Sequence, residues 1–138
     1  MDRPLPVIDD INRDCWEGAR NNRLVIYRCG ECRYWIHPPL EACPQCQSER
    51  VAGEEVSGKG AVYSWSVMYS KGNPGFDHKL PYATVIVELP EQEHLFTIGN
   101  IDCDPKDIEI GMPLEVTFEK INDEVTLPQW RPATGAAR

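Results

Sequence analysis

Apolar and polar residues alternate along much of the second half of the chain. Five alternating runs occur, at residues 63–69, 83–89, 95–101, 114–118 and 125–127. In the first run the apolar side carries Tyr63, Trp65, Val67 and Tyr69. A period of two residues is typical of strands with one buried face. The pattern predicts a small five-stranded barrel of the OB type, although a fragment of a β-sandwich fits the alternation equally well.

A different period marks the beginning of the chain. Small or apolar residues recur at helical spacing, at Ile8, Ile11, Cys15 and Ala19. Asp9 or Asp10 provides an N-cap, and the pattern predicts a helix that runs to about Asn21. Trp16 lies beside the apolar side of this helix, where it either anchors the helix to the rest of the fold or contacts a partner or ligand.

Four cysteines form two pairs between the helix and the first predicted barrel strand. The pairs are Cys29-Gly30-Glu31-Cys32 and Cys43-Pro44-Gln45-Cys46. This spacing is typical of a tetrahedral zinc site built from two short knuckles. We therefore expect one structural Zn²⁺, bound by Cys29, Cys32, Cys43 and Cys46. Because a closed four-cysteine site leaves no open coordination position, the metal is assigned to folding rather than to catalysis.

Two other uses of these cysteines fit the sequence less well. A disulfide framework is disfavoured because the chain does not begin like a secretory signal. A redox pair is disfavoured because two pairs with proline between them resemble a ligand set. Cys15 and Cys103 are expected to be buried free thiols, and His37 to be a surface or hydrogen-bonded side chain.

The chain is acidic, with 14 Lys and Arg against 22 Asp and Glu in 138 residues and a net charge of −8. Affinity for nucleic acids depends largely on Lys and Arg that neutralise phosphates, so the charge argues against a nucleic-acid-binding protein. No stretch reaches 18 apolar residues, so no membrane span is expected. With no recognisable signal peptide, the expected location is the cytoplasm.

Known catalytic motifs are missing from the sequence. It contains no G-x-S-x-G, no P-loop and no G-x-G-x-x-G, and its three histidines lie in separate segments. The absence of these motifs from the sequence favours a binding or accessory protein.

The connection between the first two barrel runs is long for a barrel of this size. It covers residues 70–81 and contains Phe76, His78 and Lys79. Long connections often carry function, although a plain surface loop is an equal alternative.

Several short motifs follow one another along the chain. They are Cys15-Trp16-Glu17-Gly18, Arg28-Cys29, Cys43-Pro44, Gly60-Ala61-Val62-Tyr63-Ser64-Trp65, Pro81-Tyr82-Ala83, Gly111-Met112-Pro113-Leu114 and Leu127-Pro128. Taken in order, these motifs resemble an acyl-CoA-associated DUF-type family. The resemblance covers almost the whole chain and implies a mainly β fold. It implies an N-terminal helix at residues 1–23, a rubredoxin-like zinc ribbon at 24–52 and an OB-fold at 53–132. Residues 133–138 are small and polar and are expected to form a disordered tail.

One departure from the family concerns the residue after the second cysteine of each pair. The family commonly has glycine there, where a left-handed backbone helps the turn, whereas this chain has Arg33 and Gln47. If φ is positive at these positions, both side chains carry a modest strain.

The resemblance also implies a function. Members of the family are companions of thiolase-like enzymes, such as retro-aldolases that shorten the side chain of steroid acyl-CoA thioesters, or related acyltransferases. The expectation is a non-catalytic accessory subunit. Candidate partner or acyl-CoA contacts are Trp16, Trp35, Phe76, His78 and Lys79. The alternatives are a free-standing acyl-CoA-binding protein and a nucleic-acid-binding OB module.

Overall fold

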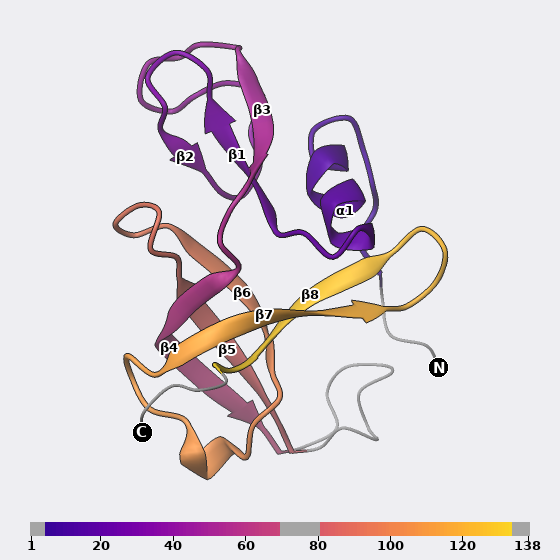
Figure 1. Ribbon diagram of the computed structural model, residues 1–138, viewed down its shortest axis with the longest axis vertical. Helices are drawn as coiled ribbons and strands as arrows, with labels where there is room; N and C mark the ends of the chain where they lie inside the picture. The colour runs from indigo at the N-terminus through magenta and orange to yellow at the C-terminus, as the bar shows by residue number, and fades with distance from the viewer. Residues whose placement is uncertain (1–4, 70–80, 134–138) are drawn as a thin grey trace.

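The computed structural model describes residues 5–69 and 81–133 of the chain. A three-stranded sheet lies at one end, the helix α1 lies beside it, and a closed barrel forms the other end (Figure 1). The described fold is mainly β with one short α-helix, as the sequence predicts.

The helix α1 spans Arg13–Arg20, so it begins later than predicted. Asp9 caps a turn ahead of the helix instead of the helix itself. Its carboxylate accepts hydrogen bonds from the backbone N–H groups of Ile11 and Asn12, both at 2.9 Å. The helix ends at Arg20 with Asn21 as its C-cap, close to the predicted end at about Asn21.

The three-stranded sheet carries the two cysteine pairs. It consists of β1 (Val25–Cys29), β2 (Trp35–Ile36) and β3 (Val51–Glu55), with β1 in the middle and both neighbours antiparallel. The sequence gives no signal for β3. Its sequence is Val-Ala-Gly-Glu-Glu, which has one large apolar residue and therefore no alternation. The expected boundary between residues 52 and 53 lies inside β3 and stays a prediction.

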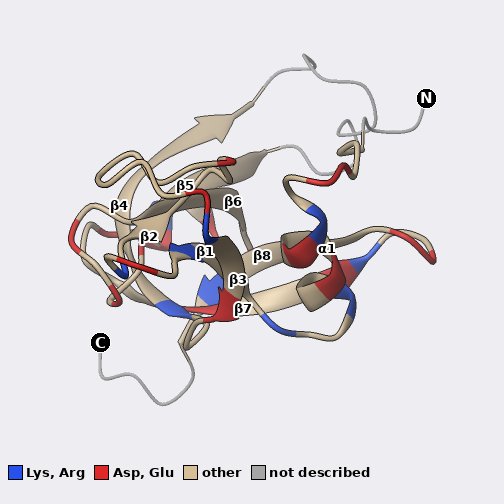
Figure 2. Ribbon diagram, turned by 90° about the horizontal axis from the view of Figure 1, so that it is seen from above, with Lys and Arg blue, Asp and Glu red and all other residues tan. Residues whose placement is uncertain are grey.

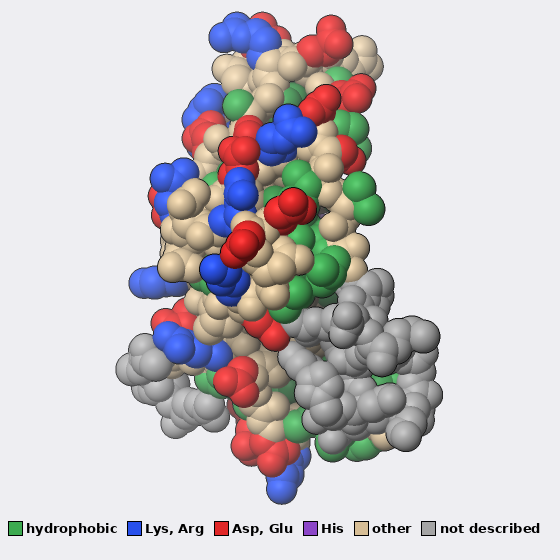
Figure 3. Space-filling view, turned by 90° about the vertical axis from the view of Figure 1, so that its right-hand side faces the viewer, with side chains coloured by type: hydrophobic (Ala, Val, Ile, Leu, Met, Phe, Trp, Pro, Cys, Tyr) green, Lys and Arg blue, Asp and Glu red, His purple; other side chains and the backbone are tan. Residues whose placement is uncertain are grey.

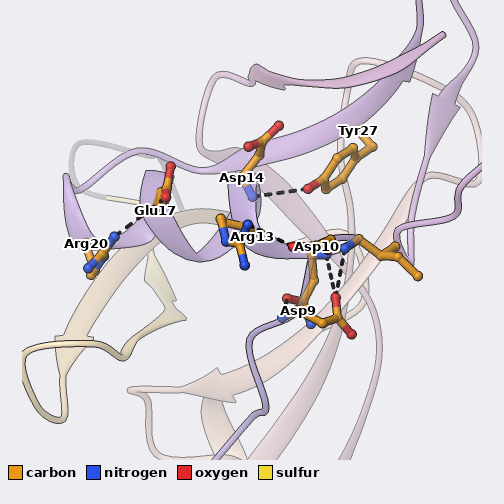
Figure 4. Close-up of polar contacts among 9 residues, drawn as sticks. Asp9, Asp10, Arg13, Asp14, Glu17, Arg20 and Tyr27 are labelled. Atoms are coloured by element: carbon orange, nitrogen blue, oxygen red, sulfur yellow. Dashed lines mark hydrogen bonds and ion pairs between the residues drawn. The ribbon is translucent and has the colours of Figure 1, made fainter.

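The helix packs closely against the middle strand of this sheet. The backbone N–H of Asp14 donates to the hydroxyl of Tyr27 at 3.1 Å (Figure 4). A Cβ atom on Gly18 would lie only 2.4 Å from Cγ2 of Val25. The absence of a side chain at Gly18 therefore sets how closely α1 approaches β1.

The barrel is built from the second half of the chain. Its strands are β4 (Lys59–Met68), β5 (Tyr82–Glu88), β6 (Phe96–Ile101), β7 (Pro113–Lys120) and β8 (Thr126–Pro132), with a short 3₁₀ helix η2 (Pro105–Asp107) before β7. The strand order is β4-β5-β6-β8-β7, and β7 returns to β4 to close the barrel. Closure confirms the predicted five-stranded OB-type barrel and removes the sandwich alternative.

A bulge changes the predicted faces of β4. Val62 pairs with Val87, but Ser64 pairs with Ile86, so Tyr63 is an extra residue on one strand. Tyr63 is 49% exposed and packs on Phe96, with the ring centroids 4.4 Å apart. The prediction that Tyr63 shares the buried side with Trp65 and Val67 is therefore wrong, because the bulge shifts the alternation.

The sheet and the barrel share one hydrophobic core. Trp35 of β2 belongs to the same buried cluster as Trp130 of β8. The side chain of Gln92, from the β5–β6 turn, bonds the backbone of Trp35 twice. It accepts from the N–H at 2.9 Å and donates to the carbonyl oxygen at 3.0 Å. These contacts join the two parts at a fixed position.

Basic and acidic residues are interspersed along the ribbon (Figure 2). Close ion pairs include Arg13 with Asp10 at 2.9 Å and Arg131 with Glu115 at 2.7 Å. Arginines that are paired with carboxylates in this way are less available to bind phosphates. Within residues 5–69 and 81–133, no helix is long and apolar enough to cross a membrane.

Candidate functional site: the cysteine cluster and the cleft below it

The two knuckles bring all four cysteine sulfurs together. The Sγ atoms of Cys29 and Cys46 are 3.5 Å apart, as are those of Cys32 and Cys43, and all four lie within 4.8 Å of one another. Metal–sulfur bonds of about 2.3 Å in a tetrahedral site place the sulfurs roughly 3.8 Å apart. The spacing therefore fits one ion the size of zinc. In the described part of the chain, no other group of three or more His, Cys, Asp or Glu is placed to hold a metal.

Backbone N–H groups point at two of the sulfurs. Cys29 Sγ accepts from the N–H of Cys32 at 3.4 Å, and this bond is the main reason that the pKa of the Cys29 thiol falls to about 6. At Cys43, burial raises the pKa, but hydrogen bonds from the N–H groups of Cys46 and Gln45 outweigh it and lower the pKa overall. Both effects favour thiolates, which are the form that binds metals.

The other two thiols hold their protons more tightly. At Cys32, the N–H of Tyr34 lowers the pKa, but burial and hydrogen bonds to the neighbouring sulfurs raise it to about 12. At Cys46, the N–H of Ser48 also lowers the pKa. The hydrogen bond to Cys29 and burial outweigh this effect, so the pKa of Cys46 is raised overall. A divalent cation in the cluster would displace these remaining protons.

Both knuckles use a left-handed residue after their second cysteine. Arg33 has a φ of 66° and Gln47 a φ of 65°. The expectation of a positive φ at these positions is confirmed. A residue with a Cβ atom costs roughly 1 kcal/mol more than glycine in this conformation.

Replacement of Gln47 by glycine is expected to stabilise the protein by about 1 kcal/mol, because it relieves this strain. The Gln47 side chain is exposed, so little packing is lost. The measurement is a thermal melt, with a rise in Tm of about 3–5 °C. The matched control is Gln45→Gly, since Gln45 is exposed in the same knuckle without a positive φ. The control should be neutral or destabilising, and equal losses in both variants would contradict the prediction.

The candidate partner contacts have different environments in the structure. Trp35 is 7% exposed, and the Arg28 guanidinium lies 4.4 Å from the centre of its ring, so its burial assigns Trp35 to the core instead of a partner surface. Trp16 is partly exposed and lines two hollows on the α1 side. Phe76, His78 and Lys79 lie outside the described residues.

An apolar cleft of about 400 Å³ lies where α1, the three-stranded sheet and the barrel meet. Its walls include Cys15 and Trp16 of α1, residues 24–26, and residues 97–100 of β6 with 127–129 of β8. Hydrophobic side chains gather on the side of the molecule where α1 and the β7–β8 hairpin lie (Figure 3). Sequence reasoning missed this cleft, because its walls come from segments far apart in the chain.

Three further side chains differ from their expected environments. His37, which also lines the cleft, is partly buried, and its Nδ1 has no hydrogen-bond partner. Burial also lowers the pKa of His37. The expectation of a surface or hydrogen-bonded histidine is therefore wrong for the Nδ1 atom. Cys15 and Cys103 are only partly buried, and burial raises the pKa of the Cys15 thiol to about 12.

Known families match the two structural parts in order. Residues 16–52 match the rubredoxin-like zinc ribbon domain of ChsH2, and residues 53–119 match the C-terminal OB-fold domain of ChsH2. A DUF35 domain-containing scaffold protein of Methanocaldococcus jannaschii is 35% identical over 102 residues, which cover 73% of this chain and 71% of that protein. The chain belongs to the DUF35 family.

Other relatives of this DUF35 chain are subunits of larger assemblies by name. The probable enoyl-CoA hydratase alpha subunit of Thermomonospora curvata is 40% identical over 131 residues, covering 95% of this chain. The chain spans only 40% of that protein's length. The benzoylsuccinyl-CoA thiolase subunit BbsA of Thauera aromatica is 29% identical over 121 residues, covering 86% of this chain and 81% of BbsA.

A solved structure confirms the relationship of this DUF35 chain at the level of the whole fold. A chain of the Ltp2-ChsH2(DUF35) aldolase superimposes with a TM-score of 0.84 and 37% sequence identity. The match covers 94% of this chain and 100% of that chain.

Proposed function

We propose that this DUF35 chain is a non-catalytic accessory subunit of a thiolase-like enzyme that acts on an acyl-CoA thioester. The observation that carries the proposal is the match to the full length of a chain of the Ltp2-ChsH2(DUF35) aldolase. Two further relatives are named as a hydratase alpha subunit and a thiolase subunit, which agrees with an accessory role. The sequence also lacks a recognisable catalytic motif.

One Zn²⁺ bound by Cys29, Cys32, Cys43 and Cys46 is part of the same proposal. The four sulfurs fit a tetrahedral ion in spacing, and backbone N–H groups already favour thiolate at two of them. When bound, the ion supplies folding free energy and no open coordination position for a substrate. The chain's own residues then hold the sheet against the barrel through Trp35 and Gln92.

The reaction of the assembled enzyme is a finer proposal. Retro-aldol cleavage of a 3-hydroxyacyl-CoA, as in steroid side-chain degradation, comes first because the matched structure is an aldolase. An acyltransferase reaction comes second. In either case the carbon chemistry belongs to the thiolase-like subunit, and this chain stabilises or completes that subunit.

Co-expression tests the proposal. The chain, carrying an affinity tag, is produced with Ltp2, and separately with the thiolase-like protein encoded nearest its own gene. We expect one of these proteins to co-purify in a stoichiometric complex. The complex, but not this chain alone, should cleave a 3-hydroxyacyl-CoA or transfer an acyl group.

Two results would overturn the proposal. Failure to bind either protein would remove the accessory role. Turnover of a 3-hydroxyacyl-CoA by the chain alone would show that it is a catalyst in its own right.

A further inference from the structure

The apolar cleft beside α1 has the size of a small-molecule site. Its volume of about 400 Å³ lies within the range of roughly 300–1,000 Å³ that is common for ligand pockets. Trp16 of α1, Ile98 of β6 and Leu127 of β8 all line it. Three separate parts of the fold therefore combine to form one hydrophobic surface.

The amide side chains in the walls of the cleft already bond other groups of the protein. Asn12 accepts from the backbone N–H of Asp9 at 2.8 Å and donates to the carbonyl oxygen of Val7 at 3.0 Å. Gln129 Oε1 accepts from the backbone N–H of Asn100 at 2.8 Å. Because these groups are engaged within the protein, the cleft offers an occupant mainly hydrophobic contact.

The cleft is also uncharged. The described residues that line it include no Asp, Glu, Lys or Arg. Its walls contain the titratable side chains of His37 and Cys15, and burial lowers the pKa of His37 and raises the pKa of the Cys15 thiol to about 12, so both are uncharged near neutral pH. An anionic group in the cleft would lose its contacts with water and gain no cation from these walls. An uncharged occupant is therefore favoured.

Two arginines near the cleft do not change this conclusion. Arg13 and Arg20 of α1 line a separate hollow, together with the acids Glu17 and Glu124. Arg13 pairs with Asp10 at 2.9 Å, and Arg20 lies 3.9 Å from Glu17. Both arginines are thus paired with carboxylates, and the hollow does not supply the cation that the cleft lacks.

We propose that the cleft beside Trp16 binds the uncharged, hydrophobic acyl group of the thioester substrate. This inference rests on the proposed accessory role and names the part of the substrate that this chain holds. An apolar acyl group matches the walls in charge and polarity, whereas the phosphates of CoA find no cation in the cleft and stay outside it. The chain thereby contributes to the choice of acyl group, while bonds form and break on the catalytic subunit.

Calorimetric titration of the zinc-loaded chain with S-decanoyl-N-acetylcysteamine tests this site, because this thioester carries a hydrophobic acyl group without the charges of CoA. S-Acetyl-N-acetylcysteamine is the matched control. Each methylene that leaves water contributes about fourfold in affinity, so the decanoyl thioester should bind at least about a hundredfold more tightly than the acetyl thioester. Decanoate has a similar chain and a negative charge, and it should bind at least about tenfold more weakly than the decanoyl thioester. Equal affinities for all three would overturn the site.

A substitution of Ile98 places the binding in the cleft. The Ile98 side chain lines the cleft and is 65% exposed, so Ile98→Asp adds a carboxylate there with little loss of core packing. We expect affinity for the decanoyl thioester to fall about tenfold or more. The matched control is Ile110→Asp, since Ile110 is 67% exposed and lies outside the cleft. Its affinity should stay within about twofold of the wild type, and equal losses in both variants would contradict a site in the cleft.

A second measurement on the unaltered protein covers the case in which Ile98→Asp does not fold. Cys15 lies in the wall of the cleft, whereas Cys103 is also partly buried and lies outside it. The protein is alkylated with N-ethylmaleimide, and each cysteine is followed by peptide mass spectrometry. Saturation with the decanoyl thioester should slow the reaction of Cys15 at least about threefold and leave that of Cys103 unchanged. Equal rates at Cys15 with and without the thioester would overturn the inference.

The outcomes separate this inference from the accessory role. If a catalytic partner co-purifies but the decanoyl thioester binds no more tightly than the acetyl thioester, the acyl site is overturned and the accessory role stands. If the thioester binds but neither Ltp2 nor the neighbouring thiolase-like protein does, the accessory role fails and the cleft is the site of a free-standing acyl-binding protein. If the partner alone protects Cys15 and abolishes thioester binding, a segment of the partner fills the cleft and the inference is overturned.

Discussion

Replacement of Cys43 by serine is expected to abolish tight metal binding and to unfold the three-stranded sheet. Cys43 is buried at 2% exposure, and its sulfur lies 3.5 Å from that of Cys32. A serine hydroxyl is a poor zinc ligand, and structural zinc contributes on the order of 10 kcal/mol to the folding of small zinc modules. Because total stability is typically about 5–15 kcal/mol, this loss is comparable to the whole.

Elemental analysis and circular dichroism check this prediction. The unaltered chain should carry one zinc per molecule, and Cys43→Ser should carry well under half of that. Cys103→Ser is the matched control, since Cys103 is a partly buried cysteine outside the cluster, and its zinc content should stay unchanged. A fully folded Cys43→Ser protein with no zinc would show that the fold does not depend on the ion.

Replacement of Trp130 by alanine is expected to cost about 3–5 kcal/mol. The side chain is 1% exposed and is among the largest fully buried side chains of the described residues. It lies at the β6–β8 seam, where only one ladder pair holds the strands, so packing has an unusual share in closing the barrel. Alanine would leave a cavity that neighbouring strands fill poorly.

Urea unfolding followed by tryptophan fluorescence and circular dichroism measures this loss. The control is Tyr63→Ala, which also removes an aromatic ring but from the exposed bulge of β4, and should cost about 1 kcal/mol. Similar losses in both variants would mean that Trp130 does not hold the seam.

Local patterns in the sequence predict much of this fold. The cysteine spacing places the four sulfurs in one cluster, and the period of two identifies all five barrel strands. Arg33 and Gln47 stand where the family commonly has glycine, and both have the positive φ that this place in the knuckle requires. In each case the deciding interactions lie within a few residues, so the sequence carries them directly.

The features that the sequence does not predict depend on contacts between distant segments. β3 has little apolar alternation and exists because β1 offers it an edge. The bulge at Tyr63 depends on the pairing of β4 with β5, which a single-strand pattern cannot show. The parallel contact between β6 and β8 pairs Ile101 with Trp130, nearly thirty residues apart, so no local pattern shows it.

Trp35 has a consequence for how such proteins are inherited and engineered. It lies in the metal-binding sheet, yet its ring completes the core of the barrel, and Gln92 fastens its backbone from the barrel side. Separating the two parts would therefore expose part of this shared core on each of them. The zinc ribbon and the barrel are therefore expected to be inherited together as one unit. An engineered exchange of the ribbon must also exchange the β5–β6 turn of the barrel.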